Sequence, residues 1–432
     1  MALPYQHSRS RLDNGLTVVT VAMPHLHSAH VALYARVGSR HEERANNGLS
    51  HFLEHMFFRG CEGYTTSTNL NDAVEDLGGT LDGYTTRDAT AFHTTVHPDH
   101  VDDLTRIMGS MFLSPAFSDI DIERAIVLEE VLDALDERGR VIEIDTVAHR
   151  ETFKDHPLGL SIDGPRKNIR RFQEDDLHAH RRRFYGAKNL VLCFAGNVKP
   201  KKCKRSAQRA FGPLFSGKRS RETAPSASVE PGRFTYVRCE DPQTRIRFSF
   251  RTVGDTHADH PAMQLVRRVL DGGLSSRLQV ELVEKRGIAY EVAADNENYN
   301  DCGLLNFELA VAHKKLVYAI EELGQVLIEL RSDGVQRAEL DQVRRRARIG
   351  LELGLDSPAG LSHWFGATQL FHDPICPEKK MKQLEAVKPR AVHQAIRRYI
   401  TGSRLSVAAV GGADVTTVRA ARRAVKKLVE AL

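Results

Sequence analysis

Two histidines and a glutamate in the segment 47–56 have the residue types and the spacing of a metal site. The composition between Gly48 and Gly60 favours a helix, and on a helix His51 and His55 stand one turn apart on the same face. Both imidazoles can then bind one Zn²⁺. Glu54 lies beside that position, where its carboxylate can polarise a metal-bound water. The pattern therefore predicts metal-assisted hydrolysis.

A third protein ligand is needed, because catalytic zinc sites usually combine three protein ligands with one water. Glu123 and Glu130 are seven residues apart and share one face of a predicted helix. A carboxylate on the apolar side of such a helix is costly unless it is paired or bound to a metal. We expect Glu130 to bind the metal and Glu123 to accept a hydrogen bond from a ligand imidazole. The spacing alone also fits a helix that carries two surface histidines.

Composition excludes several classes of protein. The chain has 432 residues, of which 41% are hydrophobic and 27% are charged, as in a soluble globular protein of two to four domains. The net charge of +5 is small for this length and predicts neither a nucleic acid nor a membrane partner. No apolar run approaches the ~18–20 residues of a membrane span, and the first residues lack the apolar core of a secretory signal.

The cysteines indicate the redox environment. Six of them lie far apart, and none belongs to a C-x-x-C pair. For a chain of this size the pattern indicates reduced and mostly buried thiols, and we expect a cytoplasmic protein.

A linker candidate divides the chain near its middle. Residues 217–232 are rich in charge, serine and proline, so we expect an N-terminal zinc-binding domain at 1–216 and a C-terminal domain at 233–432. Each half has a glycine-rich turn, at 77–79 and 270–273, and each ends in an apolar strand that leads into glycine. These parallels predict a duplication of two α+β halves.

The elements that must position the candidate ligands follow from periodicity. We expect strands at 15–21, 28–37, 234–237 and 245–250, and helices at 101–112, 121–135, 319–329 and 338–353. His93, His97 and His100 have a helical spacing that invites a second metal site. Thr94, Thr95 and Pro98 instead favour a strand that runs into a turn, so we expect no second metal there.

Around these residues the sequence resembles the pitrilysin family of zinc peptidases, the M16-type inverzincins, whose signature is H-x-x-E-H. The segment GLSHFLEHMFFRG is similar to the family's metal-binding helix, and residues 77–88 are similar to its LGG-x-LNA-x-T-x-x-D strand. Glu130 falls 75 residues after His55, where the family has its third ligand. The resemblance covers nearly the whole chain, and the length resembles the short members related to mitochondrial processing peptidase.

The resemblance implies a fold and a site. It implies two ferredoxin-like halves that form half of a clamshell chamber, one zinc per chain on His51, His55 and Glu130, and Glu54 as the general base. It further implies that a peptide pairs with the strand near 81–85, which places Asp82 and Gly83 in substrate binding. Tyr290 matches a tyrosine that binds substrate and stabilises the oxyanion.

Two positions depart from the family pattern. Asp82 stands where the family often has asparagine, and Val283 stands where an arginine usually precedes the tyrosine by seven residues. Arg286 lies only four residues before Tyr290, and we interpret it as a structural neighbour. The loss of one oxyanion donor commonly costs about 2.7–4 kcal/mol of transition-state stabilisation.

These observations predict a zinc-dependent endopeptidase that cleaves peptides or unfolded segments. Two alternatives remain open: a zinc-bearing subunit that needs a related partner to supply arginine and tyrosine, and a non-catalytic peptide-binding scaffold. In each case the resemblance implies a homodimer or a heterodimer, because short family members dimerise to complete the chamber.

Overall fold

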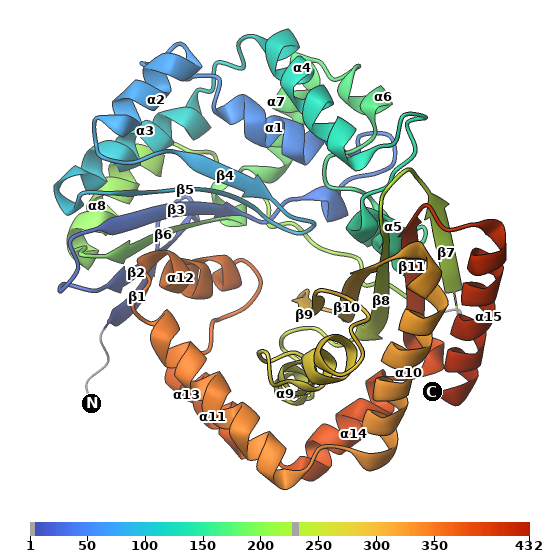
Figure 1. Cartoon of the computed structure of the whole chain (residues 1–432). Helices are drawn as coiled ribbons and strands as arrows, with labels where there is room; N and C mark the ends of the chain where they lie inside the picture. Colours follow the sequence, from blue (N-terminus) through green and yellow to red (C-terminus); the bar gives the residue numbers. More distant parts are fainter. Residues whose placement is uncertain (1–4, 227–232) are drawn as a thin grey trace. The chain divides into compact units, whose positions relative to one another are not determined.

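The structure is a computed structural model that describes residues 5–226 and 233–432 (Figure 1). These residues form two units, each considered by itself. Unit 1 holds the described residues up to Val131 together with Leu160–Glu222 and Glu352–Pro374. Unit 2 holds Leu132–Gly159, the described residues from Thr223 to Leu351, and Ile375–Leu432.

Unit 1 is built on a six-stranded sheet whose order is β1-β2-β6-β3-β5-β4. β2 and β6 are parallel, and the other neighbours are antiparallel. β4 is the last strand, so one side of it has no neighbour within this sheet. The strands are β1 (Gln6–Arg11), β2 (Thr17–Ala22), β3 (Ala29–Ala35), β4 (Asp82–Thr85), β5 (Thr90–Val96) and β6 (Leu190–Gly196).

Helices cover both faces of this sheet (Figure 1). One face carries most of them: α1 (Leu49–Phe57), α2 (Ser67–Glu75), α3 (Val101–Leu113), α4 (Ile120–Glu130), α6 (Arg166–Ile169), α7 (Glu174–Phe184) and α8 (Pro200–Phe211). The other face packs against α12 (Pro358–Ser362) and the turn His363–Ala367 that follows it. Successive strand residues point to opposite faces. Every residue of β3 and β6 is buried and nearly all are apolar, with His30 as the polar exception, so both faces of the sheet centre are covered.

Unit 2 repeats this topology. Its sheet has the order β7-β11-β8-β10-β9, with a parallel first pair and antiparallel neighbours after it, which matches β2-β6-β3-β5-β4 of unit 1. The predicted duplication of two α+β halves is therefore confirmed. The strands are β7 (Arg233–Arg238), β8 (Thr244–Thr252), β9 (Val292–Asn298), β10 (Gly303–Val311) and β11 (Leu405–Gly411).

The helices of unit 2 also lie on both faces of their sheet. α9 (His260–Leu270), α10 (Leu316–Asp333), α11 (Arg337–Gly354), α14 (Pro389–Tyr399) and α15 (Val415–Ala431) contribute to one large core with β8 and β10. α13 (Pro377–Ala386) packs beside α9. α5 (Ile144–Phe153) packs on the other face, against β11 and β8.

The two units differ from the contiguous domains 1–216 and 233–432 by two exchanged segments. Residues 132–159 come from the first half of the sequence but belong to unit 2, because Ile144, Val147 and Ala148 pack with Ala408 and Val410 of β11. Residues 352–374 come from the second half but belong to unit 1, where apolar side chains of α12 and the following turn complete the core beneath the sheet. The chain passes between the units at Glu222 and Thr223, inside the predicted linker, whose residues 227–232 lie outside the described part.

The predicted elements are largely present. The strand that contains His93 ends at Val96 and leads into a turn, as expected. The helix predicted at 121–135 is shorter, because α4 ends at Glu130 and a 3-10 turn follows over Val131–Ala134. Five of the six cysteines are buried and only Cys376 is exposed. Among the described residues, no helix combines the length and the apolar character that crossing a membrane requires.

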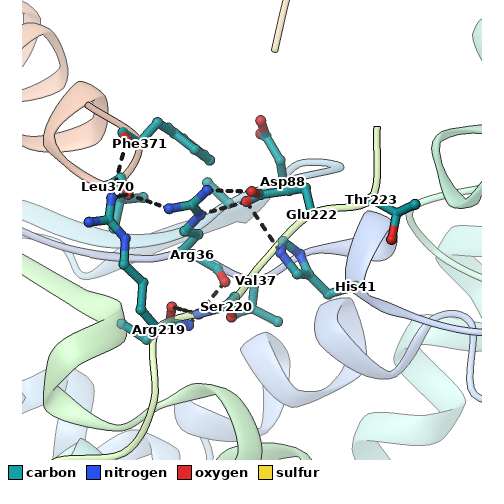
Figure 2. A network of polar contacts seen from close by, with 12 residues as sticks. Arg36, Val37, His41, Asp88, Arg219, Ser220, Glu222, Thr223, Leu370 and Phe371 are labelled. Atoms are coloured by element: carbon teal, nitrogen blue, oxygen red, sulfur yellow. Dashed lines mark hydrogen bonds and ion pairs between the residues drawn. The ribbon is translucent and has the colours of Figure 1, made fainter. Parts of the chain in front are cut away.

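Residues 219–222 are fastened to unit 1 by a buried ion pair (Figure 2). The Glu222 carboxylate accepts hydrogen bonds from the Arg36 guanidinium and lies 3.6 Å from Nε2 of His41. Arg36 also donates to the Leu370 carbonyl, which accepts a second hydrogen bond from Arg219. The network thus joins the start of the linker, β3 and the exchanged segment 352–374. Burial raises the pKa of Glu222, but His41 and Arg36 outweigh it and hold this pKa at about 2.

We predict that Glu222→Gln destabilises unit 1 in a pH-dependent way. A carboxyl whose pKa is lower in the folded protein stabilises it above the unfolded value near 4.5, and this contribution disappears as the pH falls toward 2. We expect a loss of about 2 kcal/mol at pH 7, which shrinks between pH 4.5 and pH 2. Urea unfolding followed by the fluorescence of Trp364, the single tryptophan, reports on unit 1. The exposed Glu75→Gln serves as a control, and an equal loss at pH 7 and pH 3 would contradict the prediction.

Candidate metal centre

α1 carries the H-x-x-E-H segment and is fixed between several elements of unit 1. It contacts β4, β5, α4 and α7, and its apolar side chains are buried among them. Gly48 precedes the helix with a φ of 97°, in the left-handed region that favours glycine. A Cβ there would lie 2.5 Å from the carbonyl oxygen of Asp163. The start of α1 is therefore pressed against the loop that precedes α6.

Three ligand atoms converge at the ends of α1 and α4. Nε2 of His51 and Nε2 of His55 are 3.2 Å apart. Glu130, the last residue of α4, places one carboxylate oxygen 3.6 Å from Nε2 of His51 and the other 3.4 Å from Nε2 of His55. Two imidazole nitrogens and a carboxylate around one point are a donor set that suits Zn²⁺. The structure thus brings together the three residues whose spacing predicted a metal site.

The tautomer of His55 also fits a metal. Nδ1 of His55 lies 2.8 Å from Oε1 of Glu123, which is buried and accepts the ring proton. Nε2 is then the ring atom that faces His51 and Glu130, as a metal ligand requires. Arg59 lies 3.5 Å from the other Glu123 oxygen and offsets the charge of this buried carboxylate. The residues present therefore fit a zinc ion.

The surroundings of His51 and His55 shift the pKa values of the two rings in opposite directions. Burial and the neighbouring His55 lower the pKa of His51 to about 4. Burial also lowers the pKa of His55, but hydrogen bonds to Glu123 and Glu130 outweigh it and raise this pKa to about 10. Metal binding must therefore displace a proton from this group, so the apparent affinity for a metal falls as the pH falls.

Glu54 lies next to His55 on α1, and its carboxylate faces β4. Its Oε2 accepts a hydrogen bond of 2.8 Å from the hydroxyl of Thr85. Burial raises the pKa of Glu54 to about 7, and the Thr85 hydroxyl acts in the opposite direction. A carboxylate near neutral pKa can both accept and return a proton at physiological pH. The sequence placed Thr85 at the end of the predicted substrate strand but did not indicate its contact with Glu54, which depends on the packing of β4 against α1.

Gly83 lies directly over the Glu54 carboxylate. A Cβ at this position would come within 3.0 Å of Oε1 of Glu54 and 2.9 Å of the Phe58 ring. Only glycine lets β4 approach the helix this closely. Asp82, the neighbouring residue, is exposed at the start of the edge strand. Both residues predicted to bind substrate in unit 1 thus lie on the strand beside Glu54.

The remaining predicted residues belong to unit 2. Tyr290 is 95% exposed just before β9, and Val283 packs against the core of unit 2. Arg286 is paired with Glu281 and Glu322. The role of Tyr290 in substrate binding stays a prediction.

A second group of possible metal ligands lies in unit 2. Asp145, His149 and Glu297 place their ligand atoms close together. Arg247 lies 3.2 Å from Asp145 and 3.9 Å from Glu297, and the Tyr299 hydroxyl donates to Glu297. The Arg247 guanidinium therefore already pairs with these carboxylates. We interpret the group as an ion-pair network that fastens α5 to β8 and β9. Neither the sequence motif nor the spacing pointed to it.

A helix with the order H-x-x-E-H, completed by a glutamate from a second helix in a duplicated α+β fold, is the arrangement of inverzincin metallopeptidases. Residues 17–166, which include this segment, match the family described as Insulinase (Peptidase family M16). Residues 171–347 match the family described as Peptidase M16 inactive domain. The two matches cover about three quarters of the chain, which belongs to the M16 peptidase family.

Relatives and solved structures agree with this assignment. An uncharacterized zinc protease of Rickettsia bellii is 29% identical over 401 residues, which cover 92% of this chain and 96% of the relative. The mitochondrial-processing peptidase subunit beta of Blastocladiella emersonii is 28% identical, with 93% and 88% covered. A protease from Helicobacter pylori has the same fold, with a TM-score of 0.87 at 20% identity over 95% of this chain and 100% of that one.

We predict that Glu123→Gln weakens zinc binding by roughly 10-fold or more, because the neutral amide is a poorer acceptor for the His55 ring proton. Competition with a chromophoric chelator at pH 7.5 measures the affinity. Glu129 is an exposed neighbour of the candidate ligand Glu130, so Glu129→Gln is the matched control and should bind zinc like the wild type. Equal affinities of Glu123→Gln and the wild type would show that Glu123 does not orient His55.

Proposed function

We propose that this chain is a zinc-dependent endopeptidase that cleaves peptides or unfolded segments. The observation that carries the proposal is the convergence of His51, His55 and Glu130 on one point, with Glu54 beside it. Membership in the M16 family and relatives named zinc proteases support the same chemistry.

His51, His55 and Glu130 would hold the metal, and Glu54 would handle the proton. When bound, zinc polarises the peptide carbonyl and lowers the pKa of water to about 7. Thr85 already occupies Oε2 of Glu54, so Oε1 is the oxygen that accepts the proton of the attacking water. The pKa of about 7 lets Glu54 pass that proton to the leaving amine.

The edge of β4 is the proposed binding place for the peptide backbone. β4 ends the sheet of unit 1, and an extended peptide can add to such an edge by main-chain hydrogen bonds. The absence of a side chain at Gly83 leaves room for the scissile bond to approach Glu54. Asp82, at the exposed start of β4, offers a carboxylate to a neighbouring part of the substrate.

A zinc-bearing subunit that needs a related partner is the second candidate. Val283 replaces the arginine that the family resemblance calls for, and Arg286 is held by two carboxylates. An oxyanion donor would then come from a second chain, either a copy of this one or a related chain. A non-catalytic scaffold is less well supported, because a scaffold has no need of Glu54 beside three metal ligands.

We predict that Glu54→Gln abolishes hydrolysis while it keeps the zinc. The purified, zinc-loaded chain is assayed alone on a mixed set of quenched fluorescent peptides, beside the variant. Loss of a general base should lower kcat at least about 100-fold. Zinc content, measured by atomic emission, should stay at one per chain.

The outcomes separate the candidates. Chelator-sensitive cleavage that Glu54→Gln removes supports a self-sufficient peptidase. Silence with one zinc bound supports the partner-dependent subunit, and silence without zinc supports the scaffold. Cleavage that survives Glu54→Gln would contradict the proposed role of Glu54.

We also predict that Gly83→Ala lowers kcat at least about 10-fold, because the added methyl displaces the Glu54 carboxylate and crowds the scissile bond. Zinc affinity should not change, since the atoms nearest to the added methyl belong to Phe58, Glu54 and Ala91, none of which is a candidate metal ligand. Gly350→Ala adds a methyl in a helix where nothing lies within 4 Å, and it should leave activity unchanged. Unchanged kcat in Gly83→Ala would place the scissile bond elsewhere.

A further inference from the structure

Glu42 is a buried carboxylate to which the proposed reaction assigns no part. It is 2% exposed and lies seven residues before Leu49, the first residue of α1. Oε2 accepts hydrogen bonds from the backbone N–H of Gly48 at 2.8 Å and from Nδ2 of Asn47 at 2.9 Å. Oε1 accepts a hydrogen bond of 2.6 Å from the backbone N–H of Ser50. Burial raises the pKa of Glu42, and these three donors oppose that shift.

These contacts satisfy donors at the beginning of the helix that carries the metal ligands. The first N–H groups of a helix have no partner within the helix, and a negative charge there is favoured by the helix dipole. Gly48 has no side chain to provide a cap, so Glu42 performs this role from outside the helix. Ser50, the residue before His51, is held twice, because its hydroxyl also lies 3.0 Å from Nε2 of the buried His180.

The same network extends to the loop on the other side of α1. Nδ2 of Asn47 donates to the carbonyl of Ser161 at 2.7 Å, and Nδ2 of Asn168 donates to the carbonyl of Asn47 at 3.0 Å. This loop carries Asp163, whose carboxylate lies 3.9 Å from Nδ1 of His51. Glu42 thus binds Ser50, which precedes His51 in the chain, and is linked through Asn47 to the loop that carries Asp163.

The segment that contains Glu42 is also tied to the end of the edge strand. The backbone N–H of Arg40 donates to the carbonyl of Arg87, two residues after Thr85, at 2.7 Å. Residues 40–42 therefore connect the end of β4, whose Thr85 binds Glu54, with the start of α1, which carries His51. The same short segment therefore resists a shift of β4 and a shift of the start of α1.

We propose that Glu42 is a positioning residue that sets the rotation and depth of α1, and through α1 the alignment of His51 with His55, Glu130 and Glu54. The proposal rests on the proposed zinc centre for its catalytic consequence. Its consequence for zinc affinity does not require peptidase activity, so the two can fail separately.

The test compares Glu42→Gln with three other variants. Glu42→Gln keeps the shape but turns an amide N–H₂ toward backbone donors. Glu42→Asp keeps the charge on a shorter side chain, and Glu43→Gln makes the same change at the adjacent exposed residue. Val74→Ala removes two buried methyl groups from α2. It is the control for a general loss of stability.

Four quantities are measured for each variant: the thermal midpoint, the zinc dissociation constant by chelator competition, and kcat and KM at saturating zinc. For Glu42→Gln we expect zinc binding weakened roughly 10-fold, a lower kcat and an unchanged KM. Glu42→Asp should restore part of both losses, and Glu43→Gln should resemble the wild type. Val74→Ala should lower the midpoint and leave zinc affinity unchanged.

Zinc affinity and kcat in Glu42→Gln that equal those of Val74→Ala would overturn the proposal and reduce Glu42 to a stabilising residue. If Glu42→Gln does not fold, the comparison uses Glu42→Asp and Asn47→Ala, and unchanged zinc affinity in both overturns it. A wild type that binds zinc but cleaves nothing, together with weakened zinc binding in Glu42→Gln, would support the positioning role and refute the self-sufficient peptidase.

Discussion

The burial of charge around α1 is the constraint on which the rest of unit 1 depends. Glu54 and Glu123 carry carboxylates into the protein, where an unpaired charge is costly. Each has a dedicated partner: the Thr85 hydroxyl for Glu54, and the His55 ring for Glu123. The partners come from β4 and from α1 itself, so neither element can move without exposing an unsatisfied charge. The result is a rigid group of candidate ligands, which is what a catalytic metal needs.

The site was predictable where its geometry is local. The i, i+4 spacing of His51 and His55 fixes their relation on any helix, and the seven-residue spacing of Glu123 and Glu130 fixes theirs. Thr85 was not predictable, because its contact depends on how β4 packs against α1. The end of α4 at Glu130 was missed for a similar reason, since the apolar spacing continues past it into a 3-10 turn.

The duplication could be predicted from the sequence, but the way the chain divides into two units could not. The sheet of unit 2 repeats the order of five of the six strands of unit 1, and the repeated glycine-rich turns and terminal strands indicated this duplication. The exchange of α5 and α12 had no sequence signal, because an amphipathic helix packs equally well on either sheet. The exchange covers the second face of each sheet with a helix from the other half of the chain.

The most direct test of the account is the location of bound zinc, measured by anomalous diffraction at the zinc edge from crystals of the zinc-loaded chain. The account predicts one strong peak within about 2.0–2.2 Å of Nε2 of His51, Nε2 of His55 and a Glu130 oxygen. A peak at Asp145, His149 and Glu297 instead, or no peak at α1, would contradict it. That result would leave Glu54 without the reaction assigned to it.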